Sequence, residues 1–213
     1  MNKLIYTLTL LFFISITGFA QKADRQLTKE VKQKAIKEAR KEAKRLKREG
    51  WYVNPGSIPL DKILENSWKK QFTEGEDGQP LYIYADGNAV AESKTAAEMQ
   101  AIEMGKLQLG GLIETNINSL ISGNIANAQL STEDAASVTE IVQSSKNIIA
   151  MQLGYVDPFF KILRDIKGKK IEVQVRLFYD RTQSLDIAKK AVRVEIKDKL
   201  KLNEEKLEKL MGL

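Results

Sequence analysis

The sequence of 213 residues contains no cysteine and no histidine, and these two absences exclude several kinds of chemistry. Without cysteine the chain forms no disulfide bond, so the packing of helices and sheet must carry its stability. The same absence removes a thiol nucleophile and the lipid-bearing cysteine of bacterial lipoproteins. Without histidine there is no Ser-His-Asp triad and no ordinary structural zinc site. We therefore expect no metal and no cofactor.

Prolines and aromatic residues are also few, with 4 prolines and 7% aromatics. Because 43% of the residues are hydrophobic and 29% are charged, the composition is that of a folded protein and not of a disordered one. The length suits one domain, or one domain with an appendage. No catalytic motif stands out from this composition.

Only one long hydrophobic run is present, at the start of the sequence. Lys3 precedes it, and it ends in Gly18-Phe19-Ala20, which places small residues three and one positions before a cut. This pattern predicts that residues 1–20 are a secretory signal peptide cleaved between Ala20 and Gln21. An uncleaved membrane anchor is the alternative, but the run is short for a span of about 20 residues. We therefore expect export, to the periplasm, the outer membrane or the cell exterior, with no transmembrane span after cleavage.

Positive charge is concentrated in residues 22–49, which hold 12 Lys/Arg against 5 Asp/Glu, whereas residues 50–213 hold 21 against 23. Good helix formers dominate this segment, so residues 21–50 are predicted to form a long basic helix that precedes the body of the protein. Gly50 is a natural left-handed stop, after which Trp51 folds back on Leu46. A narrow apolar stripe indicates that the helix packs by one edge: Leu27, Val31, Ala35, Ala39, Ala43 and Leu46.

This basic helix is the best candidate for a functional surface. Several positive charges on one rigid element attract anions such as lipid headgroups, lipopolysaccharide phosphates or acidic proteins. The alternative is a solvated helix whose charges only keep it soluble. Nucleic acid is not expected as the partner, because no aromatic residue interrupts the basic run before Trp51. The residues predicted to make electrostatic contacts are Arg40, Lys41, Lys44, Arg45, Lys47 and Arg48. Glu38 with Lys41 and Glu42 with Arg45 are spaced for ion pairs along the helix.

The remainder divides into a short connecting region and an α+β body. Residues 51–80 are predicted to hold a short helix from about Pro59 to Phe72, followed by an acidic loop. In residues 81–213 the expected order is β-α-α-β-β-α, a small antiparallel sheet of about three strands covered by helices on one side. The clearest strand is 170–179, where apolar and polar residues alternate. Gly87 is expected to mark a bulge or bend in the first strand.

Three local features of the body are similar to those of known bacterial envelope proteins. They are Tyr84-Ala85-Asp86-Gly87, the spaced Ala97, Ala101 and Gly105, and Val173-Gln174-Val175. With these features, residues 81–179 resemble the FlgT amino-terminal domain and a conserved outer-membrane lipoprotein family of Gram-negative bacteria. The basic helix and Trp51 are similar to secreted proteins of unassigned function from such bacteria. The resemblance implies envelope assembly or surface roles rather than catalysis, and it supplies no catalytic residues.

Three further patterns are open to a chemical interpretation. Ser67 and Lys70 match S-x-x-K, in which a lysine activates a serine, but the companion K-T-G element is absent. Glu74, Glu76 and Asp77 carry carboxylates that calcium prefers, although their spacing fits no EF-hand loop. The aromatic residues that could form a binding face are Tyr82, Tyr84, Phe159, Phe160, Phe178 and Tyr179. Half of this set is expected in the core, because alternation sends neighbouring residues to opposite faces of the sheet.

The sequence therefore predicts an exported, non-catalytic binding or assembly module of the cell envelope that acts through protein contacts. The first alternative is a protein that binds an anionic envelope surface through its basic helix. The second alternative is a small hydrolase with a pair of catalytic carboxylates, which would need two acids facing each other across a cleft.

Overall fold

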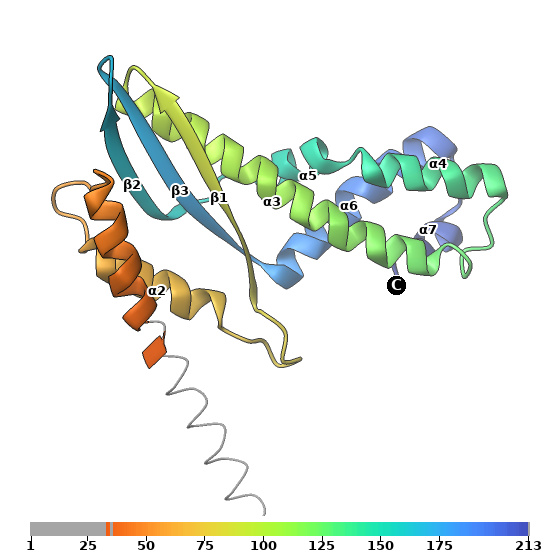
Figure 1. Cartoon of the computed structure of the whole chain (residues 1–213). Helices are drawn as coiled ribbons and strands as arrows, with labels where there is room; N and C mark the ends of the chain where they lie inside the picture. The colour runs from red at the N-terminus through yellow and green to blue at the C-terminus, as the bar shows by residue number, and fades with distance from the viewer. Residues whose placement is uncertain (1–32, 35, 213) are drawn as a thin grey trace, which may run out of the picture.

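A computed structural model describes residues 33–34 and 36–212, and it has the α+β architecture expected from the sequence (Figure 1). The predicted signal peptide and the stripe positions Leu27, Val31 and Ala35 lie outside the described residues. The first helix, called here the basic helix, is described over residues 33–34 and 36–48. The elements that follow are α2 (Leu60–Gln71), β1 (Tyr82–Ala91), α3 (Lys94–Asn124), α4 (Thr132–Gln143), α5 (Lys146–Gln152), β2 (Pro158–Ile166), β3 (Lys170–Asp180), α6 (Arg181–Leu200) and α7 (Glu204–Met211).

The three strands form one antiparallel sheet in the order β1-β3-β2, so the strand with the clearest alternation is the central one. Val173, Val175 and Leu177 of β3 are fully buried on one face, whereas Glu172, Gln174 and Arg176 belong to the other. The register of β2 shifts between Pro158 and Phe160, so Pro158 lies at an irregular position of an edge strand.

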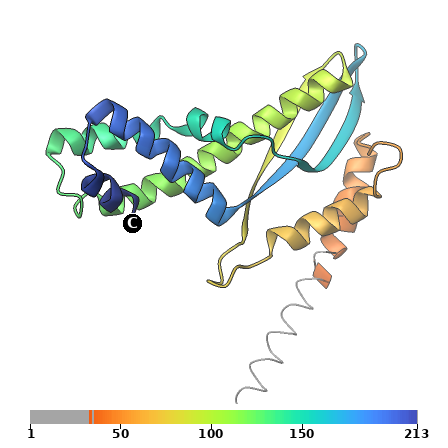
Figure 2. The ribbon, with the colours of Figure 1, turned by 180° about the vertical axis from the view of Figure 1, so that it is seen from behind.

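Helix α3 lies against the first face of the sheet at a very short distance, and small residues make this possible (Figure 2). Ala97 and Ala101 are fully buried there. A methyl group added at Gly87 would come within 1.9 Å of the Ala101 carbonyl oxygen, and one added at Gly105 within 2.9 Å of Leu177 Cδ1. Gly87 pairs with Val175 in regular register, so the expected bulge is wrong. Glycine is required because the helix backbone occupies the space of a side chain.

The second half of α3 extends away from the sheet and forms a helical lobe with α4, α5, α6 and α7 (Figure 1). With 31 residues, α3 is about 46 Å long. Gly110 lies inside this continuous helix and faces the neighbouring α5, where an added methyl group would come within 2.6 Å of the Lys146 carbonyl oxygen. One continuous core therefore extends from the sheet into the lobe.

The caps of these helices are local and follow the sequence. Ser93, Ser131, Asp180 and Asn203 each accept a hydrogen bond from a backbone N–H of the helix that follows. Helix α4 ends at Gln143, and α5 begins after a break at Ser144 and Ser145. The side chains of both serines donate hydrogen bonds back to carbonyl groups of the preceding turn. The order of the body is therefore β-α-α-α-β-β-α-α.

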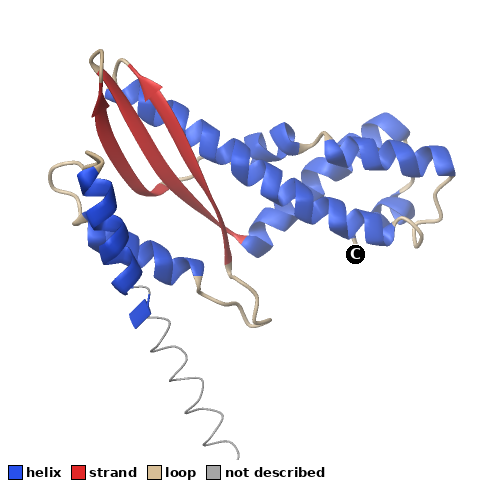
Figure 3. Ribbon diagram, viewed as in Figure 1, coloured by secondary structure: helices blue, strands red, loops and turns tan. Residues whose placement is uncertain are grey.

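The basic helix and α2, which precede residues 81–213, cover the second face of the sheet (Figure 3). A separate core forms between these helices and the sheet: Ala39, Ala43, Leu46, Trp51, Leu60, Leu64, Phe160 and Ile162. Gly50 has a φ of +86° and the Trp51 N–H donates to the Leu46 carbonyl at 2.9 Å, which confirms the predicted stop and fold-back. The basic helix is thus part of the folded body through its narrow apolar stripe.

The contact between Gly87 and α3 predicts opposite effects for two glycine-to-alanine variants. Gly87→Ala should lower the free energy of unfolding by about 3 kcal/mol or more, because the methyl group overlaps the Ala101 carbonyl. Gly123→Ala, in the same helix α3, meets no atom within 4 Å and should raise it by about 1 kcal/mol through helix propensity. Urea denaturation followed by circular dichroism measures both, and equal effects would contradict the close packing.

Candidate functional site

The outward face of the basic helix carries charges of one sign. Residues 34, 37, 41, 44 and 48 follow one another at steps of three and four, which places them on one face of a helix. We call this face the cationic stripe: Lys34, Lys37, Lys41, Lys44 and Arg48, all exposed. Ala39, Ala43 and Leu46 are buried on the opposite face against the sheet. The acidic residues Glu38, Glu42 and Glu49 belong to a flank between these two faces, so they do not interrupt the stripe.

All six cationic residues predicted from the sequence are exposed, but they do not form one group. Arg45 donates to Glu42 at 2.6 Å and to Glu49 at 2.7 Å, and hydrogen bonds to these two carboxylates raise its pKa. Lys41, Lys44 and Arg48 lie in the stripe, while Arg40 and Lys47 extend it on one side. Apart from Arg45, none of the six has an ion-pair partner among residues 33–34 and 36–212. The expected pair of Glu42 with Arg45 forms, and that of Glu38 with Lys41 does not.

Sequence reasoning missed Lys34 and Lys37, although helical spacing was the signal that could have found them. The prediction followed the density of positive charge near the end of the helix. In the structure, Ala39 and Ala43 are buried against the sheet, so the opposite face of the helix, with Lys34 and Lys37, points outward.

An ion pair and an aromatic contact hold the end of the basic helix against the sheet. The Arg164 guanidinium lies 4.6 Å from the centre of the buried Trp51 ring and donates through Nε to Glu172 at 2.9 Å. Tyr52 then exchanges two backbone hydrogen bonds of 2.8 Å with Leu163. These contacts extend the outer edge of β2 and fix the orientation of the cationic stripe.

Arg176 joins the sheet to α2 at the centre of the second face. Its side chain is 16% exposed and bonds both Asp86 oxygens, at 2.6 and 2.7 Å. It also donates to the Ser67 hydroxyl at 3.2 Å. Its guanidinium lies 5.0 Å from the Tyr84 ring centre and 5.2 Å from that of Phe160. Asp86 is therefore the ion-pair partner of Arg176.

The Ser67 and Lys70 match to S-x-x-K does not form a serine–lysine pair. Ser67 is fully buried and bonded by Arg176. Lys70 Nζ instead lies over aromatic rings, 4.3 Å from the centre of Tyr82, and no hydrogen bond joins it to Ser67 in the described part of the chain. The environment of Ser67 is that of a structural hydroxyl.

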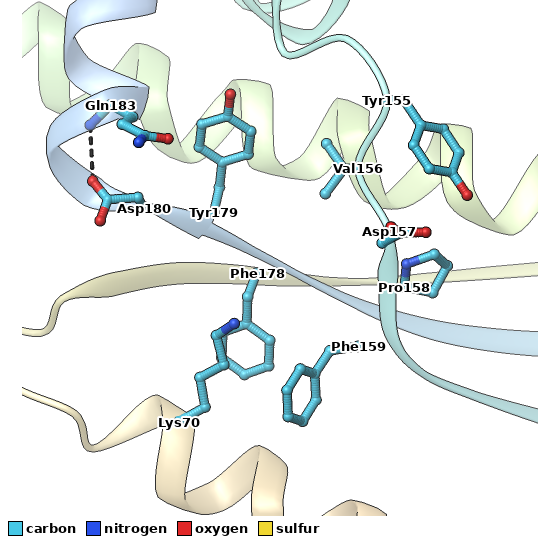
Figure 4. Close-up of a pocket in the computed structure, with 10 residues that line it drawn as sticks. All are labelled: Lys70, Tyr155, Val156, Asp157, Pro158, Phe159, Phe178, Tyr179, Asp180 and Gln183. Carbon is cyan, nitrogen blue, oxygen red and sulfur yellow. Dashed lines mark hydrogen bonds between the residues drawn. The ribbon is translucent and has the colours of Figure 1, made fainter. Parts of the chain in front are cut away.

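Four of the six predicted aromatic residues form one cluster. Phe178 is its centre, with ring centroids of Phe159, Tyr84 and Tyr82 at 5.1, 5.6 and 6.3 Å. Phe160 belongs to the second core, and Tyr179 packs on the opposite face. An open groove beside this cluster is lined by residues that include Lys70, Phe159, Asp180 and Tyr155, of which Tyr155 is 79% exposed (Figure 4). A hydrogen bond to Asp157 raises the pKa of Tyr155.

The acidic loop is held by a cation of the body. Asp77 accepts from the Gln79 backbone N–H at 3.0 Å and pairs with Arg181, and these bonds lower its pKa. Across residues 33–34 and 36–212, no three metal-ligating side chains converge on one point. Hydrogen bonds lower the pKa values of five carboxyl groups: Glu65, Asp77, Glu172, Glu204 and Glu205.

Glu172 predicts a pH dependence of stability. Burial raises its pKa, but hydrogen bonds from Asn88 and Arg164 outweigh this effect and lower the pKa below its ordinary value. A lowered pKa stabilises the folded state at pH values above the unfolded pKa, and this stability is lost as the pH falls through the folded pKa. Glu172→Gln should therefore cost about 1 to 3 kcal/mol at pH 7, with a smaller difference at pH 3. Urea denaturation followed by tryptophan fluorescence between pH 7 and 3 measures this.

The matched control is Glu76→Gln, at an exposed loop position without an ion pair in the described structure. It should leave the stability curve unchanged at every pH. A constant difference between wild type and Glu172→Gln over the whole pH range would contradict the role given to the ionised carboxylate.

Comparison with known proteins does not assign this chain to a family. No helix among the described residues is long and apolar enough to cross a membrane. No protein-family model matches the chain, and neither a curated protein nor a solved structure matches it. The resemblance to the FlgT amino-terminal domain therefore stays a prediction.

Proposed function

We propose that this protein is a non-catalytic binding module that attaches to an anionic surface through the cationic stripe. The observation that supports this most directly is the separation of charges around the basic helix. Five cations occupy the face opposite the buried residues, and the three acidic residues lie on a flank. If the predicted signal peptide exports the chain, the surface is that of the cell envelope, such as lipid headgroups or lipopolysaccharide phosphates.

The docking of the helix determines how such binding works. Each Lys or Arg close to an anionic membrane contributes about 1 kcal/mol, so five on one face give about 5 kcal/mol before the cost of association. Because Ala39, Ala43 and Leu46 are buried against the sheet, the outward face of the basic helix offers no apolar stripe to the acyl chains of a membrane. Binding is then electrostatic, and added salt weakens it. The rigid sheet holds all five charges in one orientation, which avoids the cost of ordering a flexible tail.

Protein contacts, expected first from the sequence, are a second candidate function. The aromatic cluster around Phe178 supports it, because Tyr84 and Phe159 remain 40% and 37% exposed. Aromatic side chains supply much of the contact area in protein interfaces. The carboxylate-dependent hydrolase gains no supporting observation from the site geometry.

Binding to lipid vesicles tests the proposal. The purified protein should bind vesicles that contain anionic phosphatidylglycerol and not vesicles of neutral phosphatidylcholine. The variant Lys37→Gln/Lys41→Gln/Lys44→Gln/Arg48→Gln keeps helix propensity but removes four charges, so it should bind the anionic vesicles at least tenfold more weakly. Vesicle co-sedimentation measures the bound fraction at 50 and 300 mM salt.

The control variant removes four lysines elsewhere: Lys167→Gln, Lys169→Gln, Lys170→Gln and Lys190→Gln. These lysines are exposed and form no ion pair with any described residue. Because the two variants have the same net charge, equal losses would show that only total charge matters and would contradict the proposal. Binding of the wild type to neutral vesicles, or binding that salt does not weaken, would contradict it as well.

A further inference from the structure

The outer edge of β1 has free backbone hydrogen-bonding groups at known positions. The Arg181 N–H donates to the Leu81 carbonyl, so the backbone polar groups of Leu81 point toward β3. Leu163 forms its backbone hydrogen bonds with Tyr52, on the outer side of β2. Its neighbour Val173 in β3, and likewise Val175, therefore forms its backbone hydrogen bonds with β1. Because the pattern alternates along a strand, the groups of five residues point outward: Tyr82, Tyr84, Asp86, Asn88 and Val90. None of these five has an outward backbone partner in the described structure.

This edge lacks the features that usually protect an edge strand. Native proteins protect such edges with lysine, proline, bulges or covering segments. The opposite edge has several of them, because β2 contains Pro158 and a register shift and is partly covered by Tyr52. Strand β1 has ten residues in regular register and contains no lysine or proline. Its one charge, Asp86, is paired with Arg176. An exposed and regular edge of this kind accepts an added strand.

A groove lies beside this edge, and α3 forms its floor. Helix α3 crosses the sheet diagonally, since Glu98 pairs with Lys161 of β2 while Ala101 and Gly105 lie over Gly87 of β1. Farther along α3, Gln108, Gly111 and Leu112 line a groove with Tyr84–Asp86 and Lys146. The Leu112 side chain is 46% exposed there. The groove therefore combines open backbone groups with an apolar floor.

Charge and available space decide what fits this groove. Lys146 is exposed and has no ion-pair partner within the described residues, so it favours a carboxylate. A second copy of this chain, paired antiparallel through its own β1, does not fit. Its α3 would lie beneath its own β1, in the layer that α3 already occupies beside this edge. An extended segment without a covering helix has no such conflict.

We infer that the β1 edge binds an extended segment of a partner protein by strand addition. Alternate side chains of the added strand face α3, and these are apolar where they meet Leu112 and acidic where they meet Lys146. The backbone groups of the added strand pair with the even-numbered residues from Tyr84 to Val90. This interaction uses neither the cationic stripe nor any residue proposed to meet an anionic surface.

Labelled peptides test the strand addition. The probes are two nine-residue fluorescein peptides with valine at alternate positions, threonine between them, and glutamate replacing either the first or the last valine. Fluorescence anisotropy should show that at least one binds the wild type. N-methylation of its amides that face β1 should weaken binding at least tenfold, because it removes the backbone donors. Leu112→Asp should weaken it at least fivefold, whereas Val194→Asp, at an exposed position of α6, should not.

Charge exchange then tests the role of Lys146. Lys146→Glu should weaken binding of the glutamate peptide and strengthen binding of a peptide in which lysine replaces that glutamate. Lys190→Glu should change neither. No binding at 1 mM peptide, or binding that N-methylation leaves unchanged, would overturn the inference. Amide hydrogen exchange of the free protein is independent of any peptide. It should be fast at Tyr84, Asp86 and Asn88 and slow at Ala85, Gly87 and Ala89. Concentration-dependent protection of the even-numbered amides would indicate a second copy at the edge and would also overturn it.

Discussion

The close contact between Gly87 and the backbone of α3 is the constraint on which the rest of this structure depends. Only a hydrogen atom fits between the strand and the Ala101 carbonyl oxygen, so the helix axis lies closer to the sheet than larger side chains would permit. At this short distance α3 crosses the sheet and passes beyond β1 into the helical lobe (Figure 1). The same crossing covers the first face of the sheet and forms the floor beside the free edge. Fold and groove therefore have one physical cause.

A second constraint acts on the other face, where a very narrow apolar stripe positions a highly charged helix. Alanine removes little apolar surface from water, so Ala39 and Ala43 alone would hold the basic helix weakly. Leu46 and Trp51 add larger side chains, and Arg164 lies over the Trp51 ring. Because so few residues face the sheet, most of the helix circumference is available for lysine and arginine. Docking by small residues is what leaves the outward face cationic.

Features that depend on neighbours in sequence could be predicted from the sequence. The alternation of apolar and polar residues predicted the strand over 170–179, and Ser93 and Ser131 lie at helix starts because capping is a local interaction. The role of Gly87 could not be predicted, since it depends on Ala101, which becomes its neighbour only in three dimensions. The same reason applies to Ser67, whose partner Arg176 is 109 residues away. The basic residues were found by composition, but their common direction required the burial of Ala39.

One proposed surface lies on the basic helix over the second face of the sheet and the other at the β1 edge, and this arrangement has a mechanical consequence. The basic helix is followed by Tyr52, which pairs with the outer side of β2, whereas the free edge is that of β1 across the central strand. A contact at one surface does not cover the other. Because β3 pairs with β1 over residues 171–180 and with β2 over residues 170–177, the central strand connects the two outer strands without a flexible joint. A module that adheres through the cationic stripe would therefore present the β1 edge in a fixed orientation relative to the anionic surface.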